Sequence, residues 1–347
     1  YILDLIQTHR HRQQNLYTIS YDAAKAYDTV QFWHVKKALE SFGFPQRFCT
    51  YILNYLKQSS VCVLTAYGPS EFFTPTRGIK QGDPLSPLLY ILTINSLHAY
   101  IREVNNKENL GITWQAGGST FKDASLGFAD DTIIFANTVR AIHRLHSLIV
   151  QYFQRHDLLL NIKKTNARYM IFTSETLTLS DINWEYQGEM LKWLDETKPF
   201  RYLGVHIRLD MNHKSHLREC ERSKLYPYYR RLYYGNMSLE QCVVAMREVV
   251  WPTLDFCSRF LFTPSEFVRK WDLMFVYVLK KKANVCTPQI THDGLLSVLN
   301  LLRYELHYPK AVVAEHVTFC NMNRTRWNLL SRKRILDYKD HTPFWKF

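Results

Sequence analysis

Three aspartates have the residue type and the surroundings to hold divalent metal ions. Asp22 follows the apolar segment 16–21, and Asp130 and Asp131 stand between two short apolar segments. Mg²⁺ in proteins is commonly bound by one or two carboxylates, with water and substrate phosphates as the other ligands. Two such ions, roughly 3.5–4 Å apart, stabilise the attacking and leaving oxygens when a hydroxyl displaces a phosphate group. We therefore predict Asp22 and Asp130 as bridging ligands and Asp131 as a weaker or more distant one.

A plain turn is the alternative for Asp130 and Asp131, because aspartate is favoured in turns for local reasons. By itself, a pair of aspartates in a turn indicates function only weakly. Two further negative charges beside Asp22 would repel it in the absence of a counter-ion. A fold that brings all three together would therefore favour a metal site.

The spacing of apolar residues predicts the elements that carry these aspartates. Strands are expected at 16–21, 126–128, 132–135, 167–172 and 201–207, helices at 32–42, 45–56 and 139–153, and a hairpin of 61–64 with 72–76 around Gly68-Pro69-Ser70. Gly43 is the expected stop signal of the first helix. A further helix is expected to start with Asp83 as its N-cap and Pro84 at its first position.

The order of these elements predicts how the aspartates meet. With residues 31–77 set aside, the order is strand, helix, strand, strand, helix, strand, which is the ferredoxin-like βαββαβ arrangement of an α+β fold. The first strand then lies beside the central hairpin. Asp22 and Asp130 become neighbours, although 108 positions separate them in the sequence. From about residue 210 the chain is expected to be mainly helical.

Five segments resemble, in order, motifs A to E of reverse transcriptases: residues 21–28 (YDAAKAYD), 77–87 (RGIKQGDPLSP), 128–131 (FADD), 160–165 (LNIKKT) and 200–204 (FRYLG). Motif B and the FADD core look most like the non-LTR (LINE-type) retrotransposon enzymes, whereas group II intron enzymes more often carry Tyr at the position of Phe128. A chance match to one motif is plausible, but five in order are not. The resemblance implies a right-hand polymerase palm with residual fingers in residues 1–207. It also implies a helical thumb and C-terminal extension in 208–347.

The resemblance implies roles for the residues of motifs A and C. Asp22, Asp130 and Asp131 would be the catalytic carboxylates that bind two Mg²⁺ ions, with Mn²⁺ as an alternative metal. Tyr27 would be an aromatic steric gate, whose ring clashes with a 2′-hydroxyl and so selects dNTP over rNTP. A core aromatic is the alternative for Tyr27.

The other motifs receive roles in the same way. Gln81 and Gly82 would meet the nucleotide from the motif B loop, since glycine allows close approach of the backbone; a helix entry capped by Asp83 is compatible with this. Lys164 would lie near the triphosphate and protonate the leaving pyrophosphate, with a solvated lysine as the alternative. The primer grip would consist of Phe200, Tyr202, Leu203 and Gly204, for which an ordinary edge strand is the alternative.

Basic and aromatic residues interleave between positions 222 and 234, in the sequence RSKLYPYYRRLYY. Cationic side chains beside aromatic rings are typical of a groove that binds nucleic acid, and the segment resembles a polymerase thumb by position. An amphipathic helix that packs its tyrosines into a core is an equally good interpretation.

Composition and charge limit the class of protein to which the chain can belong. Lys and Arg number 44 against 31 Asp and Glu, giving a net charge of +13 that suits a polyanionic partner. Seven scattered cysteines without a C-x-x-C pair argue against a disulfide framework and against a zinc site. The sequence has no signal peptide and no apolar run of 18 residues. An intracellular protein with no membrane partner is expected, and the resemblance implies the nucleus.

The function implied by the resemblance is RNA-directed DNA synthesis on an RNA template, from a DNA primer or target and dNTPs, by target-primed reverse transcription. Only 21 residues precede Asp22, so most of the fingers are expected to be missing. An RNA-dependent RNA polymerase, which shares the palm, is a rival that Tyr27 argues against. A catalytically inactive or domesticated RNA-binding remnant is a second rival. The retained aspartates count against it, and the expected truncation of the fingers counts for it.

Overall fold

The computed structural model describes residues 1–116, 119–173, 184–186, 188–258 and 264–285. They form two compact units. The sheet unit consists of Ile2–Gln115 and Thr120–Leu203, and the helical unit consists mainly of the chain from Gly204 onward. Residues 286–347, the last part of the predicted C-terminal extension, lie outside the described residues. The assignment of the two units to palm and thumb stays a prediction.

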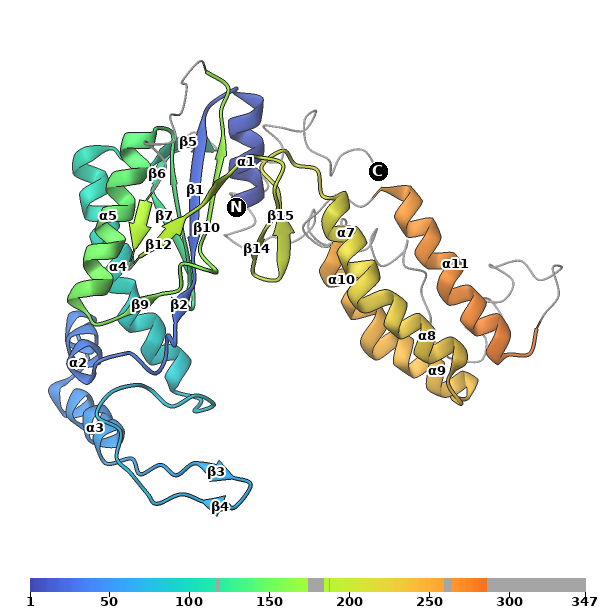
Figure 1. The fold of residues 1–347 in the computed structure, drawn as a ribbon, viewed down its shortest axis with the longest axis horizontal. Helices are drawn as coiled ribbons and strands as arrows, with labels where there is room; N and C mark the ends of the chain where they lie inside the picture. The colour runs from blue at the N-terminus through green and yellow to red at the C-terminus, as the bar shows by residue number, and fades with distance from the viewer. Residues whose placement is uncertain (117–118, 174–183, 187, 259–263, 286–347) are drawn as a thin grey trace. The chain divides into compact units, whose positions relative to one another are not determined.

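A five-stranded sheet forms the centre of the sheet unit (Figure 1). The strand order is β13-β10-β1-β8-β7, with bounds Trp193–Leu194, Asn166–Met170, Leu16–Tyr21, Asp131–Ala136 and Ser125–Phe128. The central strand β1 is antiparallel to both β8 and β10, and all its residues are buried. The order of β10, β1, β8 and β7 is the ferredoxin-like one, so the predicted α+β core is confirmed.

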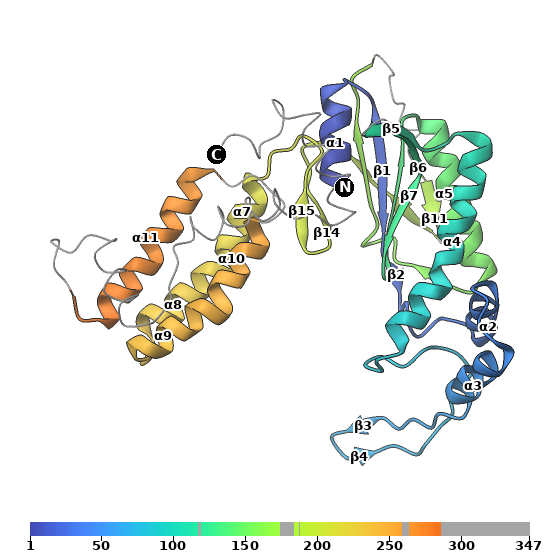
Figure 2. The ribbon, with the colours of Figure 1, turned by 180° about the vertical axis from the view of Figure 1, so that it is seen from behind.

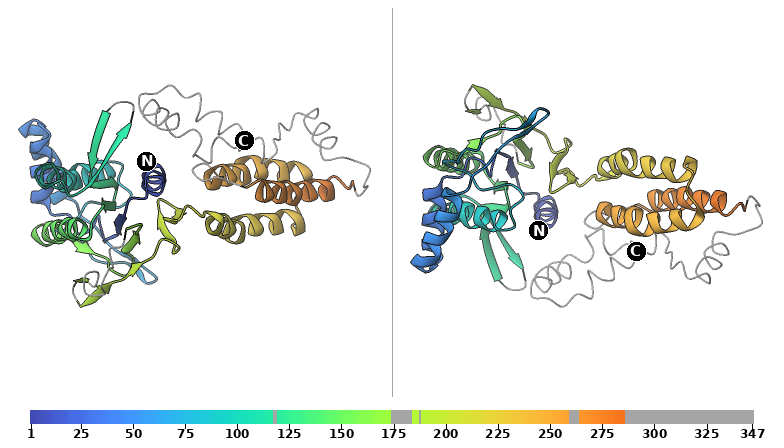
Figure 3. Two further views of the ribbon diagram at one scale, coloured as in Figure 1. Left: turned by 90° about the horizontal axis from the view of Figure 1, so that it is seen from above. Right: turned by 90° about the horizontal axis from the view of Figure 1, so that it is seen from below.

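Helices cover both faces of this sheet (Figures 1 and 3). α4 (Ser86–Glu108) and α5 (Val139–Arg155) lie on one face, and α1 (Ile2–His11) lies on the other. α5 begins where the sequence predicts, because the Thr138 hydroxyl accepts a hydrogen bond from the backbone N–H of Ala141 at 3.2 Å. A threonine at this position satisfies a backbone donor that the first helical turn leaves free.

The helices expected after the first strand are also present. α2 (Phe32–Ser41) and α3 (Gln46–Lys57) match the prediction to within a residue or two. Gly43, at φ +77°, follows the end of α2. This left-handed conformation carries no steric penalty in glycine, so the residue is an effective helix terminator.

The hairpin that follows α3 has a different turn from the predicted one. It extends away from the sheet (Figure 2), and β3 (Leu64–Thr65) pairs with β4 (Gly68–Pro69). The turn therefore lies at residues 66–67 and not around Gly68-Pro69-Ser70. The Thr65 hydroxyl donates to the carbonyl oxygen of Gly68 at 2.7 Å and accepts from the N–H of Tyr67 at 3.2 Å. These side-chain bonds close the turn earlier in the chain.

The start of α4 was also predicted too early. Asp83 Oδ1 accepts a hydrogen bond from the N–H of Leu85 at 2.8 Å, and the N–H of Ser86 donates to the Asp83 carbonyl at 3.1 Å. The aspartate thus closes a local turn over residues 83–86. The helix begins only at Ser86.

Short two-stranded sheets complete this part of the chain: β2 (Ala23–Ala24) with β9 (Leu159–Leu160), β5 (Ile112–Ala116) with β6 (Ser119–Asp123), and β11 (Trp184–Tyr186) with β12 (Glu189–Leu191). The strand predicted at 201–207 is instead a hairpin of β14 (Phe200–Tyr202) and β15 (Val205–Ile207). Its two turn residues, Leu203 and Gly204, have φ +48° and +80°. Positive φ at both positions is typical of a type I′ turn, which reverses the chain where a single strand was expected.

The helical unit is built from helices that run alongside one another (Figure 2). They are α7 (Lys214–Cys220), the π-helical η1 (Glu221–Leu225), α8 (Tyr226–Tyr234), α9 (Leu239–Ala245), the π-helical η2 (Met246–Val250), α10 (Trp251–Ser258) and α11 (Ser265–Lys282). Trp271 and Phe275 of α11 lie in its separate apolar core. The Glu221 carboxylate is buried there and accepts hydrogen bonds from Trp271 Nε1 and Lys270 Nζ, each at 2.9 Å. The predicted change to a mainly helical chain is confirmed for the described residues.

The cysteines and the helix lengths agree with the sequence analysis where they are described. Free thiols are found at Cys49, Cys62, Cys220 and Cys242, and all but Cys62 are buried. The other three cysteines lie outside the residues whose side chains are described. Within the described ranges, no helix combines the length and the apolar character needed to cross a membrane.

Three buried histidines of the sheet unit should make the free energy of unfolding fall in acid. Burial is the main cause that lowers the pKa of His34 to about 3 and the pKa values of His98 and His146 to about 4. The unfolded chain binds protons on these residues below about pH 6.5, whereas the folded chain does not. The free energy of unfolding should therefore be constant above pH 6.5 and fall between pH 6.5 and about 4. Each histidine contributes at most about 1.4 kcal/mol per pH unit.

Urea unfolding at pH 8, 7, 6 and 5 measures this slope. His98→Asn should make the slope below pH 6.5 shallower than that of the unchanged protein. Equal unfolding midpoints at pH 7 and pH 5 would show that the buried histidines do not govern stability.

Candidate active site

The pairing of β1 with β8 brings the three predicted aspartates together. Tyr21 pairs with Thr132, so the next residue of one strand, Asp22, lies across from the preceding residue of the other, Asp131. Asp130 occupies the tip of the β7–β8 hairpin, where the chain turns between the paired residues Phe128 and Asp131. This placement agrees with the prediction made from the βαββαβ order.

The electrostatics of Asp131 reflect this neighbourhood. Burial, followed by the negative charges of Asp130 and Asp22, raises the pKa of the Asp131 carboxyl, and Arg201 acts in the opposite direction. Carboxylates that disfavour one another's ionised form provide a place for a cation. The plain-turn alternative does not require Asp22 to lie so close.

Divalent metal ions fit this donor set in a particular way. Within the described ranges, no group of three or more His, Cys, Asp or Glu side chains is arranged to hold a metal. A closed protein cage is therefore not what these residues form. Mg²⁺, however, needs only one or two protein carboxylates when water and substrate phosphates supply its other ligands. Asp22 and Asp130 fit that mode of binding, with Asp131 next to them.

Motif D lies against motif A. The short strand of Ala23 and Ala24 pairs with Leu159 and Leu160, and the N–H of Asn161 donates to the Asp22 carbonyl at 2.9 Å. Lys164 is largely exposed, and its Nζ lies 3.5 Å from Asp22 Oδ2. The structure thus places this predicted substrate-binding lysine beside the aspartates. Whether it meets a triphosphate stays a prediction.

The motif B loop is hydrogen-bonded to the turn of motif A. The N–H of Gly78 donates to the carbonyl of Val30 at 2.8 Å, and the N–H of Ile79 donates to the carbonyl of Tyr27 at 2.9 Å. Gly78 has φ +91°, and a Cβ placed on it would lie 3.0 Å from the Asp28 carbonyl oxygen. The close approach of the two loops therefore depends on a glycine at this position.

The predicted nucleotide contacts of motif B lie in the same loop. Gln81 is exposed and its Nε2 donates to Asp28 Oδ1 at 3.3 Å, while Gly82 has φ +87° and open space around it. An open pocket of about 650 Å³ adjoins the loop; its lining includes Asp28, Arg77, Lys80 and Gln81. Two basic side chains in this lining suit a phosphate-bearing ligand. The roles of Gln81 and Gly82 nevertheless stay predictions.

Tyr27 lies at the edge of the core. Its ring stacks on the ring of Tyr90, with centroids 5.1 Å apart and an angle of 19° between the planes. Tyr90 is buried, and Tyr27 is only partly so. The ring has one face against the core and keeps some exposed surface, which is compatible with a gate as well as with a core aromatic.

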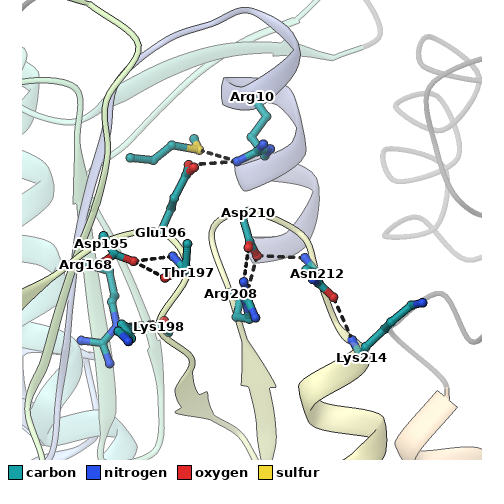
Figure 4. Close-up of polar contacts among 11 residues, drawn as sticks. Arg10, Arg168, Asp195, Glu196, Thr197, Lys198, Arg208, Asp210, Asn212 and Lys214 are labelled. Carbon is teal, nitrogen blue, oxygen red and sulfur yellow. Dashed lines mark hydrogen bonds and ion pairs between the residues drawn. The ribbon is translucent and has the colours of Figure 1, made fainter.

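The predicted primer grip begins next to a buried arginine. Arg168 on β10 is 4% exposed, and its guanidinium donates to the carbonyl oxygens of Lys198 and Pro199 at 3.2 and 2.9 Å (Figure 4). Burial lowers the pKa of Arg168 to about 10, and Asp195 acts in the opposite direction. Arg10 of α1 holds the same segment through Glu196 at 3.0 Å. The chain is therefore anchored directly before Phe200.

The primer-grip residues themselves have mixed burial. Phe200 and Tyr202 are buried, and Leu203 is 41% exposed at the hairpin turn with Gly204. Burial, with Asp131 as a second cause, raises the pKa of Tyr202 to about 12. The structure thus brings Tyr202 near Asp131, and the primer grip stays a prediction.

The tyrosines of α8 divide between the core and the surface, since Tyr228, Tyr229 and Tyr233 are partly buried and pack against the apolar core of the helical unit. Of its side chains only Leu232 is fully buried, and Tyr226 and Tyr234 are exposed. Cations lie over several rings: Lys281 Nζ is 3.9 Å from the centroid of Tyr233, and Lys270 Nζ is 5.3 Å from that of Tyr226. Both interpretations of this segment therefore stay predictions, because some of its tyrosines pack against the core and others lie at the surface beside cations.

Two residues of this site were not identified from the sequence. Tyr90 lies in an ordinary apolar stretch of α4, and nothing in its spacing distinguishes it from a core residue. Arg168 does carry a signal, because it is a charged residue inside a predicted strand whose other residues are largely apolar or aromatic. A buried charge of this kind indicates a dedicated set of hydrogen-bond partners.

Comparisons with known proteins agree with this geometry. The family model described as "Reverse transcriptase (RNA-dependent DNA polymerase)" matches residues 2–207. A Retrovirus-related Pol polyprotein from type-2 retrotransposable element R2DM of Drosophila melanogaster is 26% identical over 288 residues, which is 82% of this chain and 26% of that protein. A Pol polyprotein from type-1 retrotransposable element R2 of Popillia japonica is 28% identical over 207 residues, 58% of this chain and 28% of the relative. The chain spans about a quarter of the length of these two relatives.

Among solved structures, a telomerase from Candida Tropicalis in complex with a TWJ fragment of telomeric RNA is similar with a TM-score of 0.42 and 14% identity, covering 91% of this chain and 52% of that one.

Gly78 and Gly82 give a matched pair of substitutions in the motif B loop. Both have positive φ, so Ala at either position is strained by about 1 kcal/mol or more. Only at Gly78 does the added Cβ also meet backbone, at Asp28. We expect Gly82→Ala to lower the free energy of unfolding by about 1 kcal/mol and Gly78→Ala by roughly 2–3 kcal/mol.

Urea denaturation of the two variants measures the difference. Equal losses would show that the loop does not depend on its close approach to the motif A turn.

Proposed function

Because this chain belongs to the reverse transcriptase (RNA-dependent DNA polymerase) family, we propose that it is the catalytic part of an RNA-directed DNA polymerase of a non-LTR retrotransposon. Its substrates are dNTPs, an RNA template and a DNA primer or target. The observation that carries the proposal is the convergence of Asp22, Asp130 and Asp131 at one edge of the sheet, with Lys164 3.5 Å from Asp22. Its place of action is the nucleus.

Reverse transcriptases use divalent metal ions, and two Mg²⁺, or Mn²⁺ in their place, would be held here by Asp22 and Asp130. When bound, such ions supply charge that stabilises the attacking and leaving oxygens of phosphoryl transfer. The reaction forms a bond between the primer 3′-oxygen and the α-phosphorus of a dNTP and breaks the bond to the leaving pyrophosphate.

The chain's own residues bind and orient the reactants. Lys164 carries a positive charge beside the carboxylates, where it attracts the triphosphate and donates a proton to the leaving group. Tyr27 presents the face of its ring that points away from Tyr90 to the sugar, and Gln81 and Gly82 border the base. The primer end lies against Phe200, Tyr202, Leu203 and Gly204. The chain directly before this segment is held by Arg168, which donates hydrogen bonds to the carbonyls of Lys198 and Pro199.

The net charge of the chain and the aromatic residues of α8 support an RNA or DNA partner. The net charge of +13 favours association with a polyanion. On α8, tyrosines with cations over their rings provide stacking surfaces next to charges that neutralise phosphates. Both features suit a template and primer.

Primer extension on an RNA template tests the proposal. The full-length protein should incorporate dNTPs, but not rNTPs, only in the presence of Mg²⁺ or Mn²⁺. Asp130→Asn should lower the rate by on the order of 10²- to 10³-fold, because a metal ion stabilises the transition state by several kcal/mol. The matched control is Asp157→Asn, an exposed aspartate in the left-handed conformation that asparagine also tolerates.

The control variant should extend the primer at the rate of the unchanged protein. Persistent extension by Asp130→Asn would refute the assigned carboxylates. RNA binding without any extension would instead identify an inactive RNA-binding remnant, and incorporation of rNTPs would identify an RNA polymerase.

A further inference from the structure

Both the main chain and the ring of Tyr27 are held by groups of the same unit. Its backbone carbonyl accepts the hydrogen bond from the N–H of Ile79 at 2.9 Å. Its neighbour Ala26 is buried in the core. Tyr90 lies flat against the ring itself, 5.1 Å between centroids and 19° between planes. The main chain of Tyr27 is thus fixed by the motif B loop, and its side chain is backed by Tyr90.

Tyr90 has the properties of a rigid support. It is 2% exposed and lies in α4, a 23-residue helix whose apolar residues Leu89, Ile94 and Leu97 are also buried. A side chain enclosed in this way cannot move aside without disturbing the packing of the core. Burial, and after it the charge of Asp130, raises the pKa of the Tyr90 hydroxyl. Tyr90 is therefore stacked on the predicted gate and also lies near the aspartate-bearing hairpin.

A ring can exclude a hydroxyl group only if it cannot recede from it. The free face of Tyr27 is the one that a nucleotide sugar would meet, and the opposite face is in contact with Tyr90. If the space behind the ring were empty, the ring could rotate or shift into it and make room for one additional oxygen atom. The selectivity of such a gate depends on what stands behind it as much as on the gate itself.

We propose that Tyr90 is a positioning residue that holds the Tyr27 ring against the sugar of the incoming nucleotide and thereby sets the preference for dNTP over rNTP. This inference rests on the proposed polymerase function. It assigns the selectivity to a stacked pair of rings, one from motif A and one from α4.

The ratio of kcat/KM for a dNTP to kcat/KM for the matching rNTP tests the inference, measured with the full-length protein on an RNA template. Tyr90→Leu keeps an apolar side chain but removes the stacked ring, and should lower the ratio by roughly 3- to 10-fold, the size expected for the loss of one aromatic pair. Tyr90→Phe keeps the ring, and its ratio should stay within about twofold of that of the unchanged protein. A similar loss in both variants would assign the effect to the hydroxyl beside Asp130 and overturn the proposal.

Leu97→Ala is the control for general loss of packing. Leu97 is fully buried in the same helix about two turns farther on, so its truncation destabilises the unit without removing the stacked ring. Overall activity will fall with stability, but the dNTP-to-rNTP ratio should not change. A fall in the ratio for Leu97→Ala equal to that for Tyr90→Leu would mean that α4 acts through stability alone.

A double substitution separates direct from indirect action. If Tyr90 acts through the ring of Tyr27, then Tyr90→Leu should lower the ratio no further once Tyr27→Val is present. Additive losses would overturn the proposal. If the unchanged protein incorporates dNTPs but Tyr90→Leu has the same dNTP-to-rNTP ratio, this inference is refuted and the polymerase function is not. An unchanged protein that incorporates neither nucleotide refutes the polymerase function and the inference with it.

Discussion

The register of β1 against β8 is the constraint on which the candidate site depends. Tyr21 pairs with Thr132, and this pairing alone decides that Asp22 stands across from Asp131 with Asp130 at the adjoining tip. A slip by one residue would turn every side chain of a strand to the other face. Such a slip is opposed by the burial of the whole of β1 between two helical layers. The apolar core of the sheet unit therefore stabilises an arrangement of three like charges that repel one another.

Backbone hydrogen bonds of the loops then carry this register outward to the other motifs. Motif A accepts hydrogen bonds through the carbonyls of Tyr27 and Val30 from the motif B loop, and through the carbonyl of Asp22 from motif D. These bonds join main-chain atoms. They therefore fix the backbone of the loops that carry Gln81 and Lys164, whatever side chains those two positions have. Gly78 is the exception, since only a residue without a Cβ allows the loops to approach so closely.

A buried guanidinium performs the corresponding task for motif E. Arg168 turns the carbonyls of Lys198 and Pro199 toward the sheet, directly before the hairpin that holds the predicted primer grip. Hydrogen bonds to buried charged groups are among the stronger ones in proteins, and breaking them would leave the charge unsatisfied. The elements that surround the aspartates are thus positioned by polar contacts at the edges of an apolar core.

The sequence by itself determined the order of the elements, the βαββαβ topology and the meeting of Asp22 with Asp130, because these follow from the period of apolar residues, which each segment carries locally. It did not determine the turn at 66–67, the start of α4 or the β14–β15 hairpin, since side-chain hydrogen bonds of Thr65 and Asp83 and positive φ angles at Leu203 and Gly204 decided them. Only the tertiary structure decided that Tyr90 stacks on Tyr27 and that Arg168 binds residues about 30 positions away. The reason is that such contacts join distant segments, and no local pattern in either segment indicates its partner. The contacts form only once the core has brought the segments together.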